Sequence, residues 1–446
     1  MKPITLGEVA RACGGTLHGA RDDAVITAVT TDSRQVRDGA LFAAIVGERV
    51  DGHRFIDDCI TAGATAALCE KAPQSDVPYI LVDSTREALM DVAAYYRSLF
   101  DIPFIGITGS VGKTTTKEFI AAVLSTTYCV HKTAGNFNNE LGVPLTLFSL
   151  EEHHEVAVIE MGISDFGEMT RLSRMVRPDL SVITNIGRCH LENLVDRDGV
   201  LRAKTEMFTY LSDTGCIILC GDDDKLATVR AYRGIRPIFY GTDPSMPYYA
   251  DNIRENALDG VSCTLHHGDT AIDVMIPAIG RHMVLGALCA MAVGDTLGVQ
   301  PQAIRSGIEG FRNVGSRSRV VHTDRLTVID DCYNANPTST MAGIDTLSSL
   351  SGRRVAVLGD MKELGTDERA LHRTVGAYAK ERGIDRLIAV GELSEETAAG
   401  FGSGAFYYPT VDDCLHAIDT LLCNGDTVLI KASHSMHFEQ IVAAIT

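Results

Sequence analysis

The sequence lacks a segment that could span a membrane. None of its 446 residues belongs to a run of about 18 consecutive apolar residues, the length a membrane-spanning helix needs. Residues 1–8 also lack the apolar core of a signal peptide. We therefore expect a soluble cytoplasmic protein with no stable membrane insertion.

Positive charge is scarce as well. The chain has 40 Lys and Arg residues against 58 Asp and Glu residues, so its formal net charge is −18. This acidic balance repels polyphosphates and acidic lipids, which argues against nucleic acid or an acidic membrane as a partner. An anionic ligand must then be held by local lysines, arginines and helix N-termini.

Cys-x-x-C pairs are absent, although the chain has 12 cysteines. Cys216 and Cys220 are one residue too far apart for that spacing. Reduced thiols fit this pattern better than a disulfide framework or a zinc site. Long repeats and low-complexity segments are absent too. The composition, with 45% hydrophobic and 22% charged residues, is typical of an ordinary globular protein.

The length predicts about three domains, because a chain of this size is too long for one core. We place them at residues 1–101, 102–313 and 314–446, with the first boundary next to Pro103. In the second domain apolar strands alternate with helical segments, which predicts an α/β fold with a doubly wound, mostly parallel sheet. A hairpin is expected near residues 261–275. The third domain resembles a Rossmann fold but lacks G-x-G-x-x-G, so no dinucleotide is implied.

A glycine-rich turn opens the second domain at residues 106–116, with sequence GITGSVGKTTT. It stands between an apolar strand and a helical segment, as a phosphate-binding loop does. Lys113 would reach the terminal phosphates, and the Thr114 hydroxyl could ligate magnesium. The strict P-loop pattern fails, because Ile107 stands where it requires glycine. The alternative is an ordinary strand-to-helix turn.

Polar residues directly follow two predicted strands of this domain. Glu160 ends the apolar strand 156–159, and His190 closes the segment that follows strand 180–183. Both should lie at the same sheet edge as the glycine-rich turn. Glu160 could hold magnesium, and His190 could ligate a second cation or orient a phosphate. The alternatives are a solvated carboxylate and a surface or packed histidine.

Lys204 lies in a helical pattern over residues 200–211. The spacing of Leu201, Phe208 and Leu211 places it on their apolar stripe. A lysine there either extends its amine to water or sits desolvated with a lowered pKa. A desolvated amine can be carbamylated by carbon dioxide, which converts the cation into a magnesium-binding carboxylate.

Several basic and amide side chains could receive the anions of a nucleotide and a substrate, although each is weak evidence alone. Asp330 and Asp331 follow a predicted strand and could accept hydrogen bonds from ribose, or could be half-solvated strand-end residues. The basic and amide candidates are Arg34, Asn136, Asn138, Asn139 and Arg317.

Taken together, these motifs resemble the Mur ligases, the ATP-dependent amide-bond-forming enzymes of peptidoglycan assembly. The loop TGSVGKT at residues 108–114 is similar to that family's own phosphate loop. Within the family, further segments resemble the type that uses UDP-N-acetylmuramoyl-tripeptide and D-alanyl-D-alanine. These segments are DSR at 32–34, DGH at 51–53, GNFNNELGVP at 135–144, DDCYNANP at 330–337 and VLGDMKELG at 357–365.

The resemblance implies ATP and magnesium as cofactors, and UDP-N-acetylmuramoyl-tripeptide and D-alanyl-D-alanine as substrates. The first domain would hold the UDP-sugar through Ser33, Arg34 and the loop 47–53. The γ-phosphoryl group would pass to the peptide carboxylate, and the dipeptide amine would attack the acyl phosphate. The third domain would swing closed over ATP and exclude water. We expect a monomer.

The family's residue roles map onto this sequence as follows. ATP would contact Gly109, Ser110, Val111, Gly112, Lys113, Thr114, Thr115, Arg317 and Asp331. Catalysis would use Lys113, Glu160, His190 and a carbamylated Lys204. Thr114 and Glu160 would bind one magnesium ion, and His190 and Lys204 the other. Substrate would contact Ser33, Arg34, Asn136, Asn138, Asn139, Asn334 and Asp360.

Two segments depart from the family pattern. Gly286 stands where relatives usually carry an asparagine that contacts adenine, so base recognition is expected to be weaker or differently made. His434 and His437 replace two arginines, so charge there depends on pH. One alternative is another ligase of the superfamily, which adds a single amino acid to a UDP-muramoyl peptide or glutamate to folate. The other, prompted by these departures, is a degenerate ligase that survives as a nucleotide-sugar-binding or scaffold protein.

Overall fold

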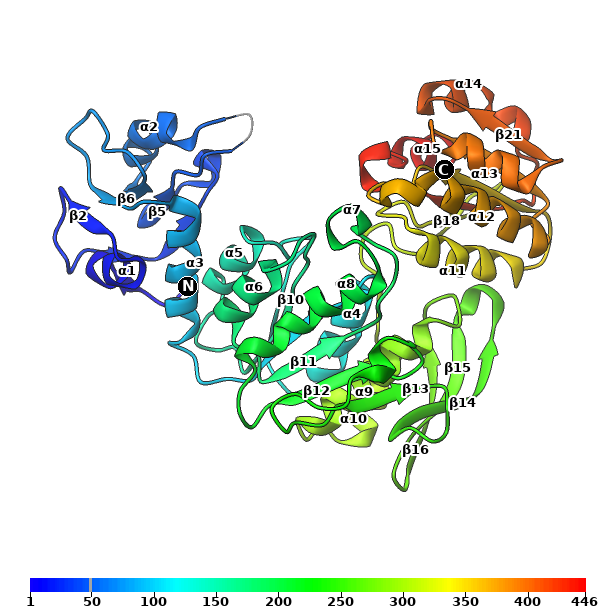
Figure 1. The fold of residues 1–446 in the computed structure, drawn as a ribbon, viewed down its shortest axis with the longest axis horizontal. Helices are drawn as coiled ribbons and strands as arrows, with labels where there is room; N and C mark the ends of the chain where they lie inside the picture. Colours follow the sequence, from blue (N-terminus) through cyan, green and yellow to red (C-terminus); the bar gives the residue numbers. More distant parts are fainter. Residues whose placement is uncertain (48–49) are drawn as a thin grey trace.

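The computed structural model describes residues 1–47 and 50–446, and it has three domains, each built on one main sheet (Figure 1). The first and third domains lie on opposite sides of the central domain in this view. None of the helices in the described ranges is long and apolar enough to span a membrane. The predicted α/β class is confirmed, whereas the boundaries at residues 101 and 313 stay predictions.

The first domain contains a five-stranded sheet in the order β2-β7-β6-β5-β4. Its strands are parallel except β2, which pairs antiparallel with β7. The predicted loop 47–53 includes residues 48 and 49, which lie outside the described residues. The elements are β1 (Ile4–Thr5), α1 (Leu6–Cys13), β2 (Thr16–His18), β3 (Val25–Ile26), β4 (Ala28–Thr30), β5 (Ala40–Ala43), α2 (Ile56–Thr61), β6 (Ala64–Cys69), β7 (Tyr79–Leu81) and α3 (Thr85–Arg97).

The central domain contains a nine-stranded sheet in the order β16-β15-β14-β13-β12-β11-β8-β10-β9. The strands from β9 to β14 run parallel, and β15 and β16 add an antiparallel extension. The strands are β8 (Phe104–Thr108), β9 (Val130–Lys132), β10 (Val156–Glu160), β11 (Leu180–Ile183), β12 (Cys216–Cys220), β13 (Ile238–Gly241), β14 (Tyr248–Glu255), β15 (Val261–His267) and β16 (Thr270–Ile276). The helices are α4 (Lys113–Leu124), α5 (Gly142–Phe148), α6 (Glu168–Val176), α7 (Leu191–Leu194), α8 (Arg197–Thr205), α9 (Met283–Thr296) and α10 (Pro301–Glu309).

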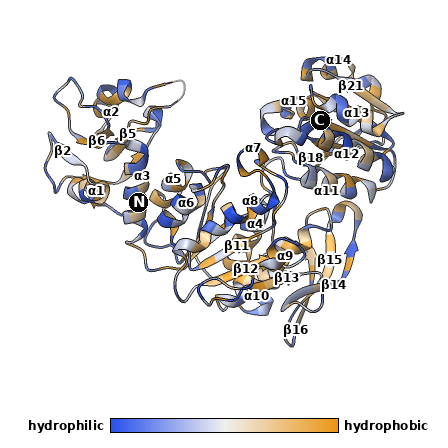
Figure 2. Ribbon diagram, in the orientation of Figure 1, coloured by the Kyte–Doolittle hydropathy of each residue, from blue (hydrophilic) through white to orange (hydrophobic). Residues whose placement is uncertain are grey.

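Apolar sequence accounts for the centre of this domain. Strands β8, β10 and β11 are buried at every residue, as expected for parallel strands covered on both faces. Helix α9 is apolar on almost all sides and packs on α4, so it is a buried helix rather than an amphipathic surface helix. Figure 2 shows this apolar centre in orange, against a hydrophilic α8.

Of two local predictions in the central domain, the helix needs correction and the hairpin does not. The helix predicted over residues 200–211 ends as an α-helix at Thr205 and continues as a 3-10 helix, Glu206–Tyr210. The Thr205 hydroxyl donates to the Leu201 carbonyl at 2.8 Å, and such back-bonding weakens the helical ladder. The hairpin predicted near residues 261–275 is confirmed, because β15 and β16 pair antiparallel, and β14 adds a further antiparallel strand on β15.

The third domain contains a six-stranded sheet in the order β17-β18-β22-β19-β20-β21, parallel except for β17. Apolar clusters cover both faces of this sheet, and one of them also includes Ile279 of the central domain. The first and central domains share a continuous apolar cluster, and the first domain has a smaller cluster of its own. Its elements are β17 (Arg319–His322), β18 (Thr327–Asp330), α11 (Pro337–Ser348), β19 (Arg354–Gly359), α12 (Glu368–Glu381), β20 (Arg386–Val390), α13 (Ser394–Phe401), β21 (Ala405–Tyr408), α14 (Val411–Leu421), β22 (Thr427–Lys431) and α15 (Glu439–Ile445).

Candidate functional site

The glycine-rich turn connects β8 to α4 in the middle of the central sheet. Gly109 has φ +151°, and a Cβ there would lie 1.9 Å from the Thr184 hydroxyl oxygen. Gly112 caps α4 with φ +79°. Both positions require glycine because a side chain would clash or strain the backbone. The turn therefore brings its backbone close to the neighbouring strand and directs the N-terminus of α4 toward the cavity.

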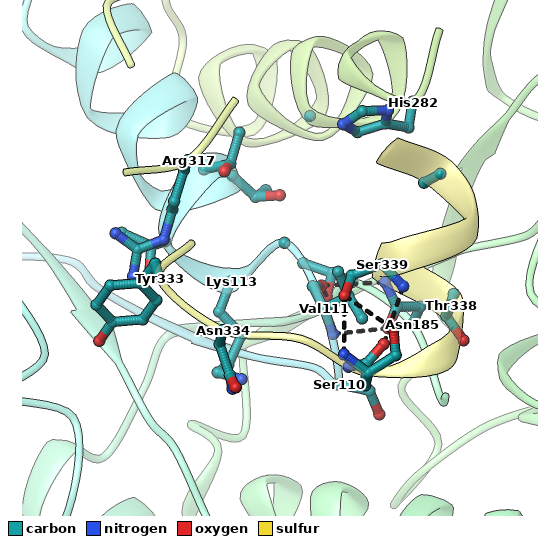
Figure 3. A pocket seen from close by; sticks show the side chains of 18 of the residues that line it. Ser110, Val111, Lys113, Asn185, His282, Arg317, Tyr333, Asn334, Thr338 and Ser339 are labelled. Atoms are coloured by element: carbon teal, nitrogen blue, oxygen red, sulfur yellow. Dashed lines mark hydrogen bonds between the residues drawn. The ribbon is translucent and has the colours of Figure 1, made fainter. Parts of the chain in front are cut away.

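The segment after β11 holds the turn in place. Val111 donates its backbone N–H to Asn185 Oδ1 at 2.9 Å, and Ser110 donates to the Asn185 carbonyl at 3.1 Å (Figure 3). The Val111 carbonyl accepts from the Thr184 hydroxyl at 2.6 Å. Lys113 curls over the turn and donates to the Gly109 carbonyl at 2.9 Å. The loop is thus preorganised, and the lysine amine lies directly above it.

Glu160 meets Thr114 at the end of β10, as the strand order predicts. Its Oε1 accepts from the Thr114 hydroxyl at 3.2 Å and from Asn138 Nδ2 at 2.8 Å. Its Oε2 is buried and has no hydrogen-bond partner among the described residues. The nearest cation, Lys117 Nζ, lies 3.8 Å away. A buried carboxylate oxygen without a donor, beside a hydroxyl, suits a hard divalent cation.

A buried ionic network supports Glu160 from behind. Lys117 is 1% exposed, donates to the Thr133 carbonyl at 2.7 Å and lies 3.1 Å from Glu118 Oε1. Glu118 also pairs with Lys132. The Thr133 hydroxyl accepts from the Glu160 backbone N–H at 2.9 Å. Removing one member would leave a buried charge uncompensated, so the network holds Glu160 at the sheet edge.

His190 and Lys204 lie on the other side of the glycine-rich turn. His190 lines the cavity, and its Nδ1 lies 2.7 Å from Glu363 Oε2 of the third domain. Lys204 does not extend to water: it is 1% exposed, and burial lowers the pKa of its amine to about 8. It is close enough to Lys113 and Cys189 for their charges to act on its amine, and it is not among the described residues that line the cavity.

The third domain supplies the opposite wall. The Arg317 guanidinium lies 3.6 Å from the centre of the Tyr333 ring, a pairing visible in Figure 3. Asp331 accepts from Lys431 Nζ at 2.6 Å and from the Ser318 backbone at 3.0 Å. Lys431 also donates to the Asn334 carbonyl at 2.9 Å. Arg317 is therefore a positive group at the cavity, whereas Asp331 already has an ionic partner.

Together these walls enclose a cavity of about 640 Å³ between the central and third domains. The central domain contributes the glycine-rich turn, Thr115, Asn138, Asn139, Glu160 and His190. The third domain contributes Arg317, Asp331 and Asn334. The sheet edges predicted from sequence do converge, and the volume suits a nucleotide-sized ligand. The roles assigned to these residues stay predictions.

Some predicted substrate residues lie elsewhere. Ser33 and Arg34 are in the first domain, where Arg34 pairs with Asp32 and holds the pKa of that carboxyl at about 2. Asn136 is exposed and is not one of the described cavity residues. Asp360 is 1% exposed and accepts from the Ser394 hydroxyl at 2.8 Å and from Lys362. The described cavity wall does not include it either.

Several residues that line the cavity were missed, among them Lys431 and Tyr333. Lys431 ends β22, and its strand-end position is the same signal that identified Asp331, but its pairing could not be foreseen. Tyr333 is part of the DDCYNANP segment, yet its role as a platform for Arg317 depends on tertiary packing. His434 and His437 stand where the family pattern has arginines. The His434 ring stacks near Tyr333 with ring centres 5.5 Å apart, and His437 pairs with Glu439.

Comparison with known proteins assigns the chain to a family. Family models match residues 107–294 (Mur ligase middle domain), 316–434 (Mur ligase, glutamate ligase domain) and 25–97 (Mur ligase family, catalytic domain). A UDP-N-acetylmuramoyl-tripeptide–D-alanyl-D-alanine ligase of Bacillus subtilis is 38% identical, over 98% of this chain and 97% of that one. The chain belongs to the Mur ligase family.

Further proteins are similar to this Mur ligase over nearly its whole length. The Escherichia coli protein with the same description is 34% identical over 100% of this chain and 99% of its own. A crystal structure of MurF from Acinetobacter baumannii superposes with a TM-score of 0.94 at 31% identity, covering 99% of this chain and 98% of that chain. MurF ligase from Thermotoga maritima in complex with ADP gives 0.84 at 28% identity, covering 93% and 96%.

The departure at Gly286 has a packing reason in this Mur ligase. Gly286 lies in α9 at the cavity, and a Cβ there would come 2.7 Å from the Phe119 ring. Phe119 stacks on Phe311 with ring centres 3.7 Å apart, so it has little room to move. The stacked pair and the glycine are therefore mutually dependent, and an asparagine does not fit.

We expect Gly286→Asn to lower the free energy of unfolding by about 1–3 kcal/mol, because it overpacks a closed site. Nucleotide affinity should not improve. Thermal unfolding and calorimetric titration with a non-hydrolysable ATP analogue measure both quantities. Combining it with Phe119→Leu in a double-mutant cycle should recover part of the loss. An unchanged melting temperature with tighter nucleotide binding would contradict this packing account.

Proposed function

We propose that this Mur ligase joins D-alanyl-D-alanine to UDP-N-acetylmuramoyl-tripeptide at the expense of ATP, and so completes the pentapeptide precursor of peptidoglycan. The observation that carries the proposal is the cavity, where the glycine-rich turn, Lys113, Glu160 and His190 face Arg317. The descriptions of relatives that match over the full length support the same substrates. A cytoplasmic location and a monomeric state belong to this proposal as predictions.

The nucleotide would lie with its phosphates on the turn. Backbone N–H groups near Gly112 and the start of α4 attract the phosphate oxygens, and Lys113 would exchange its contact with the Gly109 carbonyl for the terminal phosphates. Arg317 would meet the nucleotide from the third domain. The ADP complex of the Thermotoga maritima relative supports an adenine nucleotide as the ligand of this cavity.

Magnesium fits the donor set of the central domain. Thr114 and Glu160 would hold one ion, and His190 with a carbamylated Lys204 would hold the other. Two observations support these assignments. Glu160 Oε2 has no hydrogen-bond partner among the described residues, and burial of Lys204 favours the neutral form of its amine. When bound, such ions would neutralise the negative charge that develops on the phosphate oxygens during phosphoryl transfer.

The chemistry that this arrangement supports has two steps. The peptide carboxylate attacks the γ-phosphorus of ATP, the bond to ADP breaks, and an acyl phosphate forms. The amine of D-alanyl-D-alanine then attacks the acyl carbon, phosphate leaves, and the amine loses one proton as the amide forms. Lys113 and Arg317 would stabilise the phosphoryl oxygens, and the third domain would exclude water from the acyl phosphate.

A substrate panel tests the proposal. Pure protein is incubated with ATP, magnesium and UDP-N-acetylmuramoyl-tripeptide, carrying either lysine or diaminopimelate at the third position, and phosphate release is measured. Release should require D-alanyl-D-alanine, and the two tripeptides should differ in rate, which identifies the natural third residue. Release only with single amino acids, or only with a folate and glutamate, would exclude the proposed function.

A further inference from the structure

One ion pair joins the cavity directly to the third domain. His190 Nδ1 of the central domain lies 2.7 Å from Glu363 Oε2, which belongs to the loop between β19 and α12. The backbones approach closely at the same place: a Cβ on Gly365 would lie 3.4 Å from the Glu192 backbone nitrogen. The contact is therefore part of the surface on which the two domains meet.

Both residues of the pair adopt backbone conformations that L-residues rarely take. His190 has φ +51° and Glu363 has φ +63°. Left-handed backbone is unfavourable for residues with a Cβ and persists where the surrounding structure requires it. Here the two strained residues meet each other at the edge of the cavity. Their conformations turn the imidazole and the carboxylate together.

The neighbouring lysine does not compete with His190 for the Glu363 carboxylate. Lys362, the residue next to Glu363, donates instead to Asp360 Oδ2 at 2.8 Å. The Glu363 side chain is 61% exposed, so water solvates its carboxylate and the group that meets the His190 ring is an anion. An ionised carboxylate at Nδ1 favours a proton on that nitrogen and leaves the Nε2 lone pair free. Histidines that bind metals in proteins are commonly oriented by such a carboxylate.

We propose that Glu363 is a positioning residue: it comes from the third domain, orients the His190 ring and fixes the tautomer whose Nε2 can ligate a cation. The proposal rests on the cation role of His190 in the proposed function. It adds a link between the domains, because the histidine is held correctly only when the third domain is docked. Catalysis of phosphoryl transfer would then be coupled to domain closure.

Glu363→Ala tests this link, first in the ligand-free protein. With isotope-labelled histidine, NMR reports which ring nitrogen of His190 carries the proton, and His190→Gln assigns the signals. We expect a proton on Nδ1 in the unsubstituted protein and a mixture of tautomers in Glu363→Ala. Glu192→Ala is the matched control, because it removes an exposed carboxylate from the facing helix α7, and no described cation pairs with it. It should leave the His190 signals unchanged.

The second readout is the magnesium concentration that gives half-maximal phosphate release. We expect a rise of about 10–100-fold in Glu363→Ala and no change in Glu192→Ala. Because the Glu363 side chain is 61% exposed, the fold should tolerate its loss, and the melting temperature checks this. Glu363→Gln should give an intermediate value, since its amide oxygen can still accept from Nδ1.

Unchanged His190 signals in Glu363→Ala would overturn the proposal, even if the magnesium requirement rose, because the carboxylate would then act by some route other than the ring. An unchanged magnesium requirement would overturn it as well. Failure of the proposed function is distinguishable, since it would show as no phosphate release by the unsubstituted protein, while the NMR comparison would still report on the pair.

Discussion

Replacing Lys204 by alanine should reduce kcat by about 10³-fold or more, the scale seen when a group that stabilises transition-state charge is removed. The reason is its position: the side chain is almost fully buried and close enough to Lys113 for the two charges to interact. A buried amine with a lowered pKa is poorly placed as a surface cation and well placed for carbamylation. Phosphate release with both substrates measures the loss.

Chemical rescue separates a lost ligand from a damaged fold. Formate or acetate should restore part of the activity of Lys204→Ala if a carboxylate is what the site lacks. Arg202→Ala is the matched control on the same helix, because Arg202 is exposed and its guanidinium lies over the Phe166 ring at 5.3 Å. It should stay within a few-fold of the unsubstituted protein. Unchanged turnover in Lys204→Ala would refute its role in binding a cation.

Replacing Glu160 by glutamine should lower kcat by about 10²–10³-fold, because it removes the charge of the buried carboxylate that faces the cavity. The neutral amide would bind a divalent cation much more weakly. The magnesium concentration needed for half-maximal rate should rise in parallel. Steady-state kinetics across a magnesium series measures both effects.

Glu118→Gln is the matched control for Glu160→Gln. Both substitutions remove one negative charge next to the buried Lys117, but Glu118 is not one of the described residues that line the cavity. Both should lose stability, and only Glu160→Gln should lose the magnesium response. Equal kinetic losses in the two variants would mean that the network supports the fold alone and that Glu160 has no direct contact with a cation.

The glycine-rich turn shows how far local sequence can be used. The strict phosphate-loop pattern fails at Ile107, yet the strand, the glycines and Lys113 were predicted in the correct order. The structure shows where glycine is needed in this turn: its tight approach occurs at Gly109, where a Cβ would meet Thr184. The convergence of Glu160 on this turn was predictable too, because parallel strands present their carboxyl ends at one edge.

Residues with several plausible partners were harder to predict. Asn139 was predicted to contact substrate, but its side-chain oxygen accepts from the Gly142 backbone at 2.8 Å at the start of α5, in addition to its place at the cavity. Asp360 is committed to Ser394 and Lys362. A motif shows that a polar residue is present. Whether its side chain contacts a ligand or bonds to the protein itself depends on which donors lie within about 3 Å.

The sequence by itself determined the α/β class, the family and the strand-end positions of the chemistry, because hydrophobic periodicity and short motifs are local properties. Only the tertiary structure decided that Lys204 is buried rather than extended to water, that Lys431 neutralises Asp331, and that Glu363 reaches His190. Those outcomes depend on burial and on contacts between residues far apart in the chain. Periodicity along one segment could raise burial of Lys204 as one of two outcomes, but it could not choose between them.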